Sequence, residues 1–178
     1  AATAQLRDLA DFAVGLFFVW VRDGRVNLSS AGLGPDHVTS LAAWMKRPEV
    51  SAVLNEVNMS DNPLTGGDVW GNGSVQRGTD ISGVSVLFPS MTAVITLNVS
   101  NCGLGPSAMP ELSKLVRDAS AVLTSLTLSH NPLTDGDSEM SGFIALCAVC
   151  GQLNEVNLSD CGIGPASASQ GLIPVAQE

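Results

Sequence analysis

Apolar and polar residues alternate in five short stretches of the chain, and each stretch opens a segment of similar sequence. In Val57-Asn58-Met59-Ser60, for example, an extended backbone places apolar side chains on one side and polar side chains on the other. This alternation is typical of a strand with one buried face. We therefore expect strands near residues 26–28, 57–59, 97–99, 126–128 and 156–158.

The five segments are internal repeats. Their sequences are "DGRVNLSSAGL" from Asp23, "LNEVNMSDNPL" from Leu54, "VITLNVSNCGL" from Val94, "LTSLTLSHNPL" from Leu123 and "LNEVNLSDCGI" from Leu153. They share the pattern L-x-x-L-x-L-x-x-(N/C)-x-L, except that the first has Asp23 and Ala31 at two of the defining positions. Units of this kind bury an apolar face only when they stack, so the sequence predicts neighbouring parallel strands.

Helices are expected between the strands, because apolar residues recur there at helical spacing. In the third and fourth segments these residues are Met109, Leu112, Leu115, Val116, Ala119, Phe143, Leu146, Cys147 and Cys150. Residues 1–22 show the same spacing at Leu6, Leu9, Ala13, Leu16, Phe17 and Trp20. We expect them to form the helix of a preceding repeat, or a cap.

The repeats resemble those of leucine-rich repeat proteins, and the alternation of two segment types about 29 residues long is similar to the ribonuclease-inhibitor-like subfamily. The resemblance extends over essentially the whole chain. It implies one α/β domain spanning residues 1–178, a leucine-rich repeat solenoid (horseshoe) with parallel strands on the concave face and helices on the convex face.

The ninth position of the pattern is expected to turn into the core. Asn62 and Asn131 occupy it in the second and fourth segments, and Cys102 and Cys161 in the third and fifth. An amide there can hydrogen-bond backbone groups of the turn and of the neighbouring unit, and a thiol can do so weakly. These four residues are the predicted structural ladder.

The second segment is longer than the others, because it contains an insertion at residues 69–79, "VWGNGSVQRGT". We expect this loop to project from the rim between strand and helix. A neutral insertion is one interpretation, since long loops cost little free energy. In the other, Trp70 and Arg77 are binding anchors, because Trp and Arg dominate interface hot spots.

The exposed strand positions predict a polar surface with few aromatic side chains. The net charge of −9 and the pI near 4.4 disfavour nucleic acid and anionic membranes as partners and favour a protein with a basic surface. The predicted partner-binding residues are Glu56, Asn58, Asp61, Trp70, Arg77, Asn98, Asn101, Thr127, His130, Glu155, Asn157 and Asp160.

No catalytic, metal or cofactor site is predicted. Cys147 and Cys150 have the C-x-x-C spacing, but no second pair of ligands accompanies them. The segment "DGDSE" at residues 135–139 lacks the Gly and the terminal Glu of a calcium loop, and His37 and His130 have no nucleophile motif beside them. Unpaired cysteines favour a reducing compartment, so we expect a cytoplasmic protein.

The sequence therefore predicts a non-enzymatic protein-recognition module, a fragment of a larger receptor or scaffold protein. Two alternatives stay open, a regulator of a partner enzyme (an inhibitor or a GTPase activator) and a structural spacer. End-to-end self-association is also expected, because truncated repeat arrays expose apolar ends.

Overall fold

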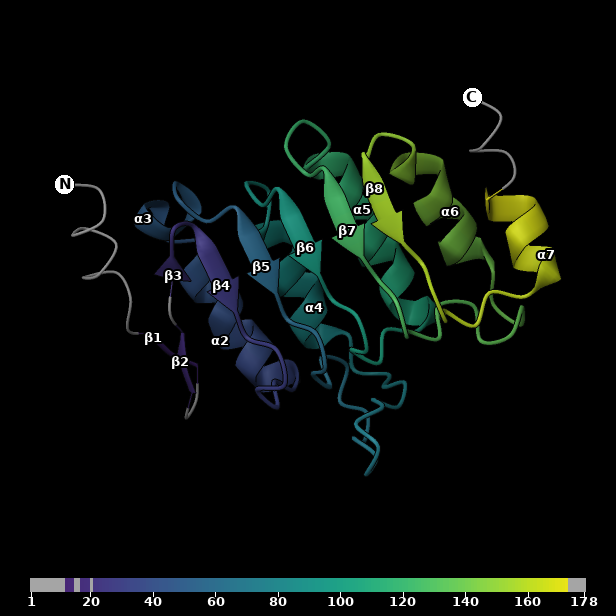
Figure 1. The fold of residues 1–178 in the computed structure, drawn as a ribbon, viewed down its shortest axis with the longest axis horizontal. Helices are drawn as coiled ribbons and strands as arrows, with labels where there is room; N and C mark the ends of the chain where they lie inside the picture. Colours follow the sequence, from purple (N-terminus) through teal and green to yellow (C-terminus); the bar gives the residue numbers. More distant parts are fainter. Residues whose placement is uncertain (1–11, 15–16, 20, 173–178) are drawn as a thin grey trace.

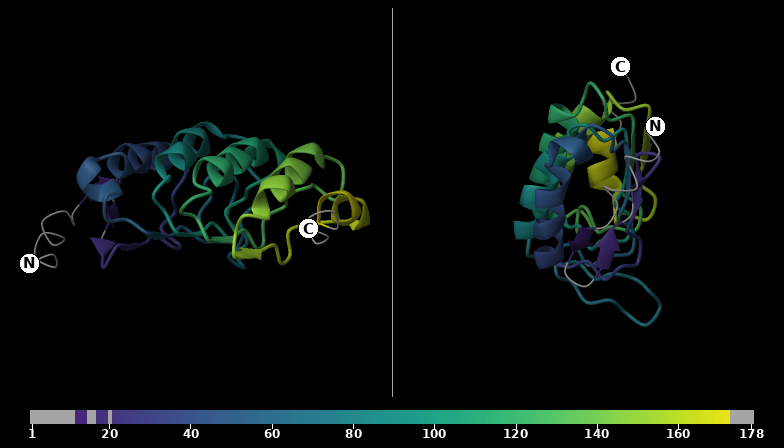
Figure 2. Two further views of the ribbon diagram at one scale, coloured as in Figure 1. Left: turned by 90° about the horizontal axis from the view of Figure 1, so that it is seen from above. Right: turned by 90° about the vertical axis from the view of Figure 1, so that its left-hand side faces the viewer.

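The computed structural model describes residues 12–14, 17–19 and 21–172. A six-stranded sheet forms one layer, and helices cover one face of it (Figures 1 and 2). The strands follow one another in the sheet in chain order: β3 (Val21–Arg22), β4 (Arg25–Asn27), β5 (Glu56–Asn58), β6 (Thr96–Asn98), β7 (Ser125–Thr127) and β8 (Glu155–Asn157).

The helical layer consists of short helices that follow the strands β4 to β8 along the chain. They are α2 (Pro35–Met45), α3 (Pro48–Ser51), α4 (Ser82–Leu87), α5 (Met109–Asp118), α6 (Ser141–Cys150) and α7 (Pro165–Ser167). The 3-10 turns η1 (Phe88–Ser90) and η2 (Pro106–Ala108) and the π-helical turn η3 (Ala168–Leu172) complete the layer. Helix α2 packs against α4, and α5 packs against α6.

The four parallel strand pairs share one register. Their central residues lie directly opposite one another across the sheet, and these are Val26, Val57, Leu97, Leu126 and Val156. The first four are buried beneath the helices, as is the row two residues later, which consists of Leu28, Met59, Val99 and Leu128. The alternation in the sequence thus directs two apolar rows into one core, which also holds Trp44, Phe88 and Phe143.

The predicted leucine-rich repeat horseshoe with an all-parallel sheet is wrong. The sheet is mixed, because β3 pairs with β4 in antiparallel orientation. Its strands are only two or three residues long, and the helices that follow them differ in length, from 11 residues in α2 to 6 in α4 and 3 in α7. The protein is therefore a mixed α/β protein rather than a regular solenoid.

The antiparallel pair arises from Asp23 and Gly24, which the repeat pattern places at the start of the first repeat. Both residues have left-handed backbone conformations, with φ of 53° and 77°. Two such residues form the tight turn that joins antiparallel strands, and Asp-Gly is a common sequence for it. The turn folds Val21 back against Val26.

The N-terminal segment differs from one of its two predictions. A helix over residues 1–22 is wrong for the part described, because β1 (Phe12–Val14) and β2 (Phe17–Val19) form a two-stranded antiparallel sheet, and the alternative of a cap stays a prediction. Phe and Val favour extended backbone, which accounts for these strands. The expected helical positions Leu6, Leu9, Leu16 and Trp20 lie outside the described residues.

No helix within the described residues is long and apolar enough to cross a membrane.

Candidate functional site

The turns that follow the strands carry a row of side chains that we call the turn row, Ser30, Asp61, Asn101, His130 and Asp160. All five residues have left-handed backbones, with φ of 55°, 60°, 49°, 58° and 54° in chain order. The backbone N–H of each of the first four donates to a serine carbonyl of the next unit, over 2.9 to 3.0 Å. These bonds keep consecutive turns in register and set the five side chains side by side.

Buried amides support the turns from inside. The Asn131 amide nitrogen donates to the carbonyls of Val99, Leu128 and Ser129, over 2.9, 2.7 and 3.3 Å. Its oxygen accepts from the backbone N–H groups of Cys102 and Leu104, each over 3.0 Å.

The Asn62 amide makes the same kind of network two segments earlier. Its nitrogen donates to the carbonyls of Leu28, Met59 and Ser60, over 2.8, 2.9 and 3.0 Å. Its oxygen accepts from Leu33 N–H over 2.9 Å. Both asparagines are fully buried, so these bonds replace the water that the backbone groups lose.

The two ladder cysteines use their thiols in the equivalent place. Cys102 Sγ donates to the carbonyls of Met59 and Ser100, over 3.1 and 3.3 Å, and Cys161 Sγ to that of Leu128, over 3.2 Å. Burial raises the pKa of Cys102 to about 12 and that of Cys161 to about 11. Neither thiol is therefore a nucleophile near neutral pH.

The insertion at 69–79 contains a small hairpin that extends beyond the carboxyl ends of the strands (Figures 1 and 2). Val69 and Val75 form an antiparallel bridge. Trp70 N–H donates to the Ser74 carbonyl over 2.9 Å, and Gly73 N–H donates to the Trp70 carbonyl over 2.8 Å. The Trp70 side chain is 57% exposed, although its backbone is held in place.

Asn101 of the turn row ties the hairpin to the turns. Its side-chain oxygen accepts from Val75 N–H over 2.8 Å, and its nitrogen donates over 2.8 Å to the Gly73 carbonyl and over 2.8 Å to Asp61 Oδ1. Val75 is only 6% exposed, so it is buried where the hairpin returns. The hairpin is therefore fixed over the neighbouring turn rather than projecting independently.

The base of the insertion is held at two further points. Thr65 Oγ1 donates to the Gly103 carbonyl over 2.8 Å and accepts from Gly78 N–H over 3.1 Å. Gly78 must be glycine, because a Cβ atom there would overlap the Thr65 carbonyl. Arg77 forms an ion pair with Asp135 of the fourth segment, with 2.6 Å between Nη1 and Oδ2.

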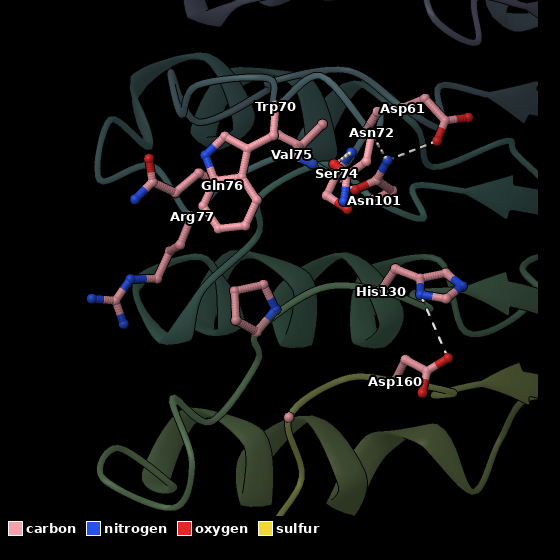
Figure 3. A pocket seen from close by; sticks show the side chains of 13 residues that line it. Asp61, Trp70, Asn72, Ser74, Val75, Gln76, Arg77, Asn101, His130 and Asp160 are labelled. Atoms are coloured by element: carbon pink, nitrogen blue, oxygen red, sulfur yellow. Dashed lines mark hydrogen bonds and ion pairs between the residues drawn. The ribbon is translucent and has the colours of Figure 1, made fainter.

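An open groove of about 760 Å³ lies between the hairpin and the turn row (Figure 3). Trp70, Gln76 and Arg77 lie on its hairpin side, and Asp61, Asn101, His130 and Asp160 lie beside the strand ends. His130 Nδ1 is 3.5 Å from Asp160 Oδ2. The remaining lining residues are Asn72, Gly73, Ser74, Val75, Pro132 and Gly162.

The groove brings together half of the predicted partner-binding residues, namely Asp61, Trp70, Arg77, Asn101, His130 and Asp160. The other half, Glu56, Asn58, Asn98, Thr127, Glu155 and Asn157, lie on the strands β5 to β8 instead. Alternation turns these strand side chains away from the buried central residues, onto the face of the sheet opposite the helices.

Several of the predicted sheet residues already have partners within the protein. The side-chain oxygens of Asn58, Asn98 and Asn157 each accept from the backbone N–H of the serine two residues later, over 3.0 Å. Glu56 pairs with Arg25, with 2.9 Å between Oε2 and Nε. The asparagines of this surface thus stabilise the turns locally, and their side-chain oxygens have less hydrogen-bonding capacity left for a partner.

Sequence reasoning missed most of the smaller groove residues, including Asn72, Val75, Gln76, Pro132 and Gly162. Pro132 belongs to the repeated Asn-Pro-Leu-Thr motif, and that repetition was a signal of a shared position in the fold. Nothing in the sequence indicates that Val75 and Gln76 would fold back toward the turn row.

The cysteines of the C-x-x-C pair lie on α6, with Cys147 buried and Cys150 partly buried. Burial raises the pKa of Cys147 to about 11 and that of Cys150 to about 12, so the C-x-x-C pair is held as thiols. The described residues contain no group of three or more His, Cys, Asp or Glu side chains that could hold a metal ion. The groove is lined by both apolar and acidic side chains.

A comparison of the chain with models of known protein families finds no match, and neither does a comparison with curated proteins.

Proposed function

We propose that the chain is a non-enzymatic protein-recognition module, and that the groove between the hairpin and the turn row is its main contact surface. The observation that carries this proposal is the placement of the exposed Trp70 opposite Asp61, His130 and Asp160. An aromatic anchor beside polar, solvent-exposed groups is the composition of an interface hot spot.

The partner we propose is a protein with a basic segment. The formal net charge of −9 repels phosphate backbones and anionic lipids and attracts a cationic protein surface. The free and largely buried cysteines support a reducing compartment, which we propose to be the cytoplasm. Self-association through the ends of the sheet stays a prediction.

The proposal is tested by affinity capture with four forms of the protein, followed by identification of the captured proteins. The forms are the wild type, Trp70→Ala in the groove, Glu56→Lys/Glu155→Lys on the sheet, and Glu49→Lys/Asp118→Lys as a control. The control makes the same charge change at exposed helical positions. We expect one basic protein to bind the wild type and the control and to be lost with Trp70→Ala.

Capture of the same proteins by all four forms would contradict the groove as the contact surface. Stimulation of GTP hydrolysis, or inhibition of an enzyme activity in the captured partner, would identify the regulator class instead. The absence of any specific partner would favour the structural spacer.

A further inference from the structure

The groove has two chemically different walls. Trp70, Val75 and Pro132 give it an apolar wall, and the turn row gives it an acidic wall, with Asp61 and Asp160 at its two ends and Asn101 and His130 between them. An occupant that satisfies both walls needs a flat or aliphatic portion and a cationic end.

The negative charges that line the groove are not all balanced by positive groups of the protein. Four ionisable residues line it, Asp61, Arg77, His130 and Asp160. Arg77 is paired with Asp135, and Figure 3 shows its guanidinium pointing away from Asp61 and Asp160. His130 is the other basic group, and it contacts Asp160 at 3.5 Å, with both side chains largely exposed, at 60% and 74%. The acidic wall therefore still attracts a cation.

The apolar wall is held in place before any partner binds. Asn101 fixes the hairpin through Gly73 and Val75, and the hydrogen bonds within the hairpin fix the backbone of Trp70. Because the backbone that carries Trp70 is already ordered, binding costs little backbone entropy there, and more of the contact energy appears as affinity.

We propose that the groove binds an arginine side chain of an extended peptide segment in the partner protein, an inference that rests on the proposed function. A guanidinium is planar and always charged, stacks on an indole, and donates two parallel hydrogen bonds to a carboxylate. Lysine lacks the planar group, so it can pair with the carboxylates of the acidic wall but cannot stack on the indole in the same way. A volume of about 760 Å³ accommodates the side chain together with flanking backbone.

The test is a titration of isotope-labelled protein with the peptide acetyl-Gly-Ser-Arg-Ser-Gly-amide, followed by NMR. The lysine-containing counterpart of the peptide is titrated in parallel. We expect saturable shifts of the Trp70 indole N–H and of the Gly73 and Gly162 amides, with tighter binding of the arginine peptide. The Trp70 signal is assigned from its loss in Trp70→Phe.

Two variants assign the binding to the two walls. Trp70→Ala should weaken the arginine peptide by about two- to fivefold, the range for a cation beside an exposed indole. Asp160→Asn should weaken it by about threefold, as expected for an exposed ion pair. The residue at 160 has a left-handed backbone, which Asn tolerates as Asp does, so this variant should fold. Asp118→Asn, which removes a charge from α5, should leave the affinity unchanged.

Equal affinities for the two peptides, no saturable shift at the groove, or affinities unchanged by Trp70→Ala and Asp160→Asn would each overturn the arginine site. The capture experiment separates this failure from that of the proposed function. A partner that is lost with Trp70→Ala, although the two peptides bind equally, would keep the groove as the contact surface and overturn only the arginine site.

Discussion

Segments 59–68 and 128–137 share the residues Ser-x-Asn-Pro-Leu-Thr-x-Gly-Asp, and their first halves have the same structure. In both, the asparagine amide, Asn62 or Asn131, donates to three backbone carbonyls. In both, the threonine hydroxyl donates to a glycine carbonyl in the next unit: Thr65 to Gly103 over 2.8 Å, and Thr134 to Gly162 over 2.7 Å.

The ends of the two segments have different roles. Asp137 accepts from the backbone N–H groups of Gly164, Ala166 and Ser167, over 3.0 to 3.1 Å, at the start of α7. Asp68 instead uses its backbone carbonyl, which accepts from Gln76 N–H over 2.8 Å within the insertion.

Arg77 and Asp137 occupy equivalent places. Arg77 lies against Gly105 in the third segment, and Asp137 lies against Gly164 in the fifth. A Cβ atom at Gly105 would overlap Arg77, and a Cβ atom at Gly164 would overlap Asp137. At this place the second segment therefore has an arginine where the fourth has a carboxylate, and the arginine forms an ion pair with Asp135. Buried polar groups keep the shared half alike, because a lost partner there costs free energy, whereas an exposed end accepts a longer loop at little cost.

The largest effect is expected from removing either buried amide. Asn62→Ala and Asn131→Ala should each lower the free energy of unfolding by about 1 to 3 kcal/mol, because each leaves buried backbone groups without partners. Urea unfolding measures the change, with the exposed Asn154→Ala as control. An unchanged midpoint for either variant would show that the two shared halves are not equivalent.

A smaller, pH-dependent effect is expected at Asp137. The pKa of its carboxyl is lowered by hydrogen bonding to Ser167 and to the N–H groups of Ala166 and Gly164, against an opposing effect of burial. A lowered pKa means that folding favours the ionised form. Its contribution to stability is therefore complete above the unfolded value of about 3.9 and is lost as the pH falls through the folded value.

Asp137→Asn tests this expectation. The stability difference between wild type and variant should be largest near neutral pH and should disappear in acid. Asp68→Asn removes the same charge at the corresponding, exposed residue and should have less effect. If the two variants lost the same free energy of unfolding at neutral pH, Asp137 and Asp68 would have equivalent roles, contrary to this prediction.

The smallest effect is expected at the ion pair of Arg77 and Asp135, whose side chains are 37% and 49% exposed. A double-mutant cycle with Arg77→Gln and Asp135→Asn should give a coupling of about 0 to 1 kcal/mol that decreases as salt is added. A larger coupling that resists salt would indicate that the pair is a main anchor of the insertion.

Much of the sheet could be predicted from local pattern, because a strand with one buried face leaves a period of two in the sequence. The parallel strands lie at Arg25–Asn27, Glu56–Asn58, Thr96–Asn98, Ser125–Thr127 and Glu155–Asn157, each beginning one residue before the expected range. Strand β3 was missed, because the repeat pattern assigned Asp23 and Gly24 to a repeat and obscured their signal as a tight turn. The horseshoe prediction failed because of this antiparallel strand and because the strands are short and the helices unequal in length.

The candidate site could be predicted only in part. The turn row follows from the repeats, since equivalent positions of stacked units lie side by side. The position of the hairpin depends on Asn101 bonding to Gly73 and Val75, residues 28 and 26 positions earlier in the chain. A contact over that distance in sequence leaves no local pattern, so Trp70 could be proposed as an anchor but not placed beside His130 and Asp160.

The left-handed backbone of the turn row limits how this surface can change in evolution. Asn, Asp and His enter that conformation several times more often than other side chains, whereas branched and bulky residues are strained there. Asp61, Asn101, His130 and Asp160 are all drawn from this small set. A descendant of this protein that acquires a new partner would therefore vary its charge and hydrogen bonding along the row much more easily than its bulk, and new apolar contacts would have to come from the hairpin.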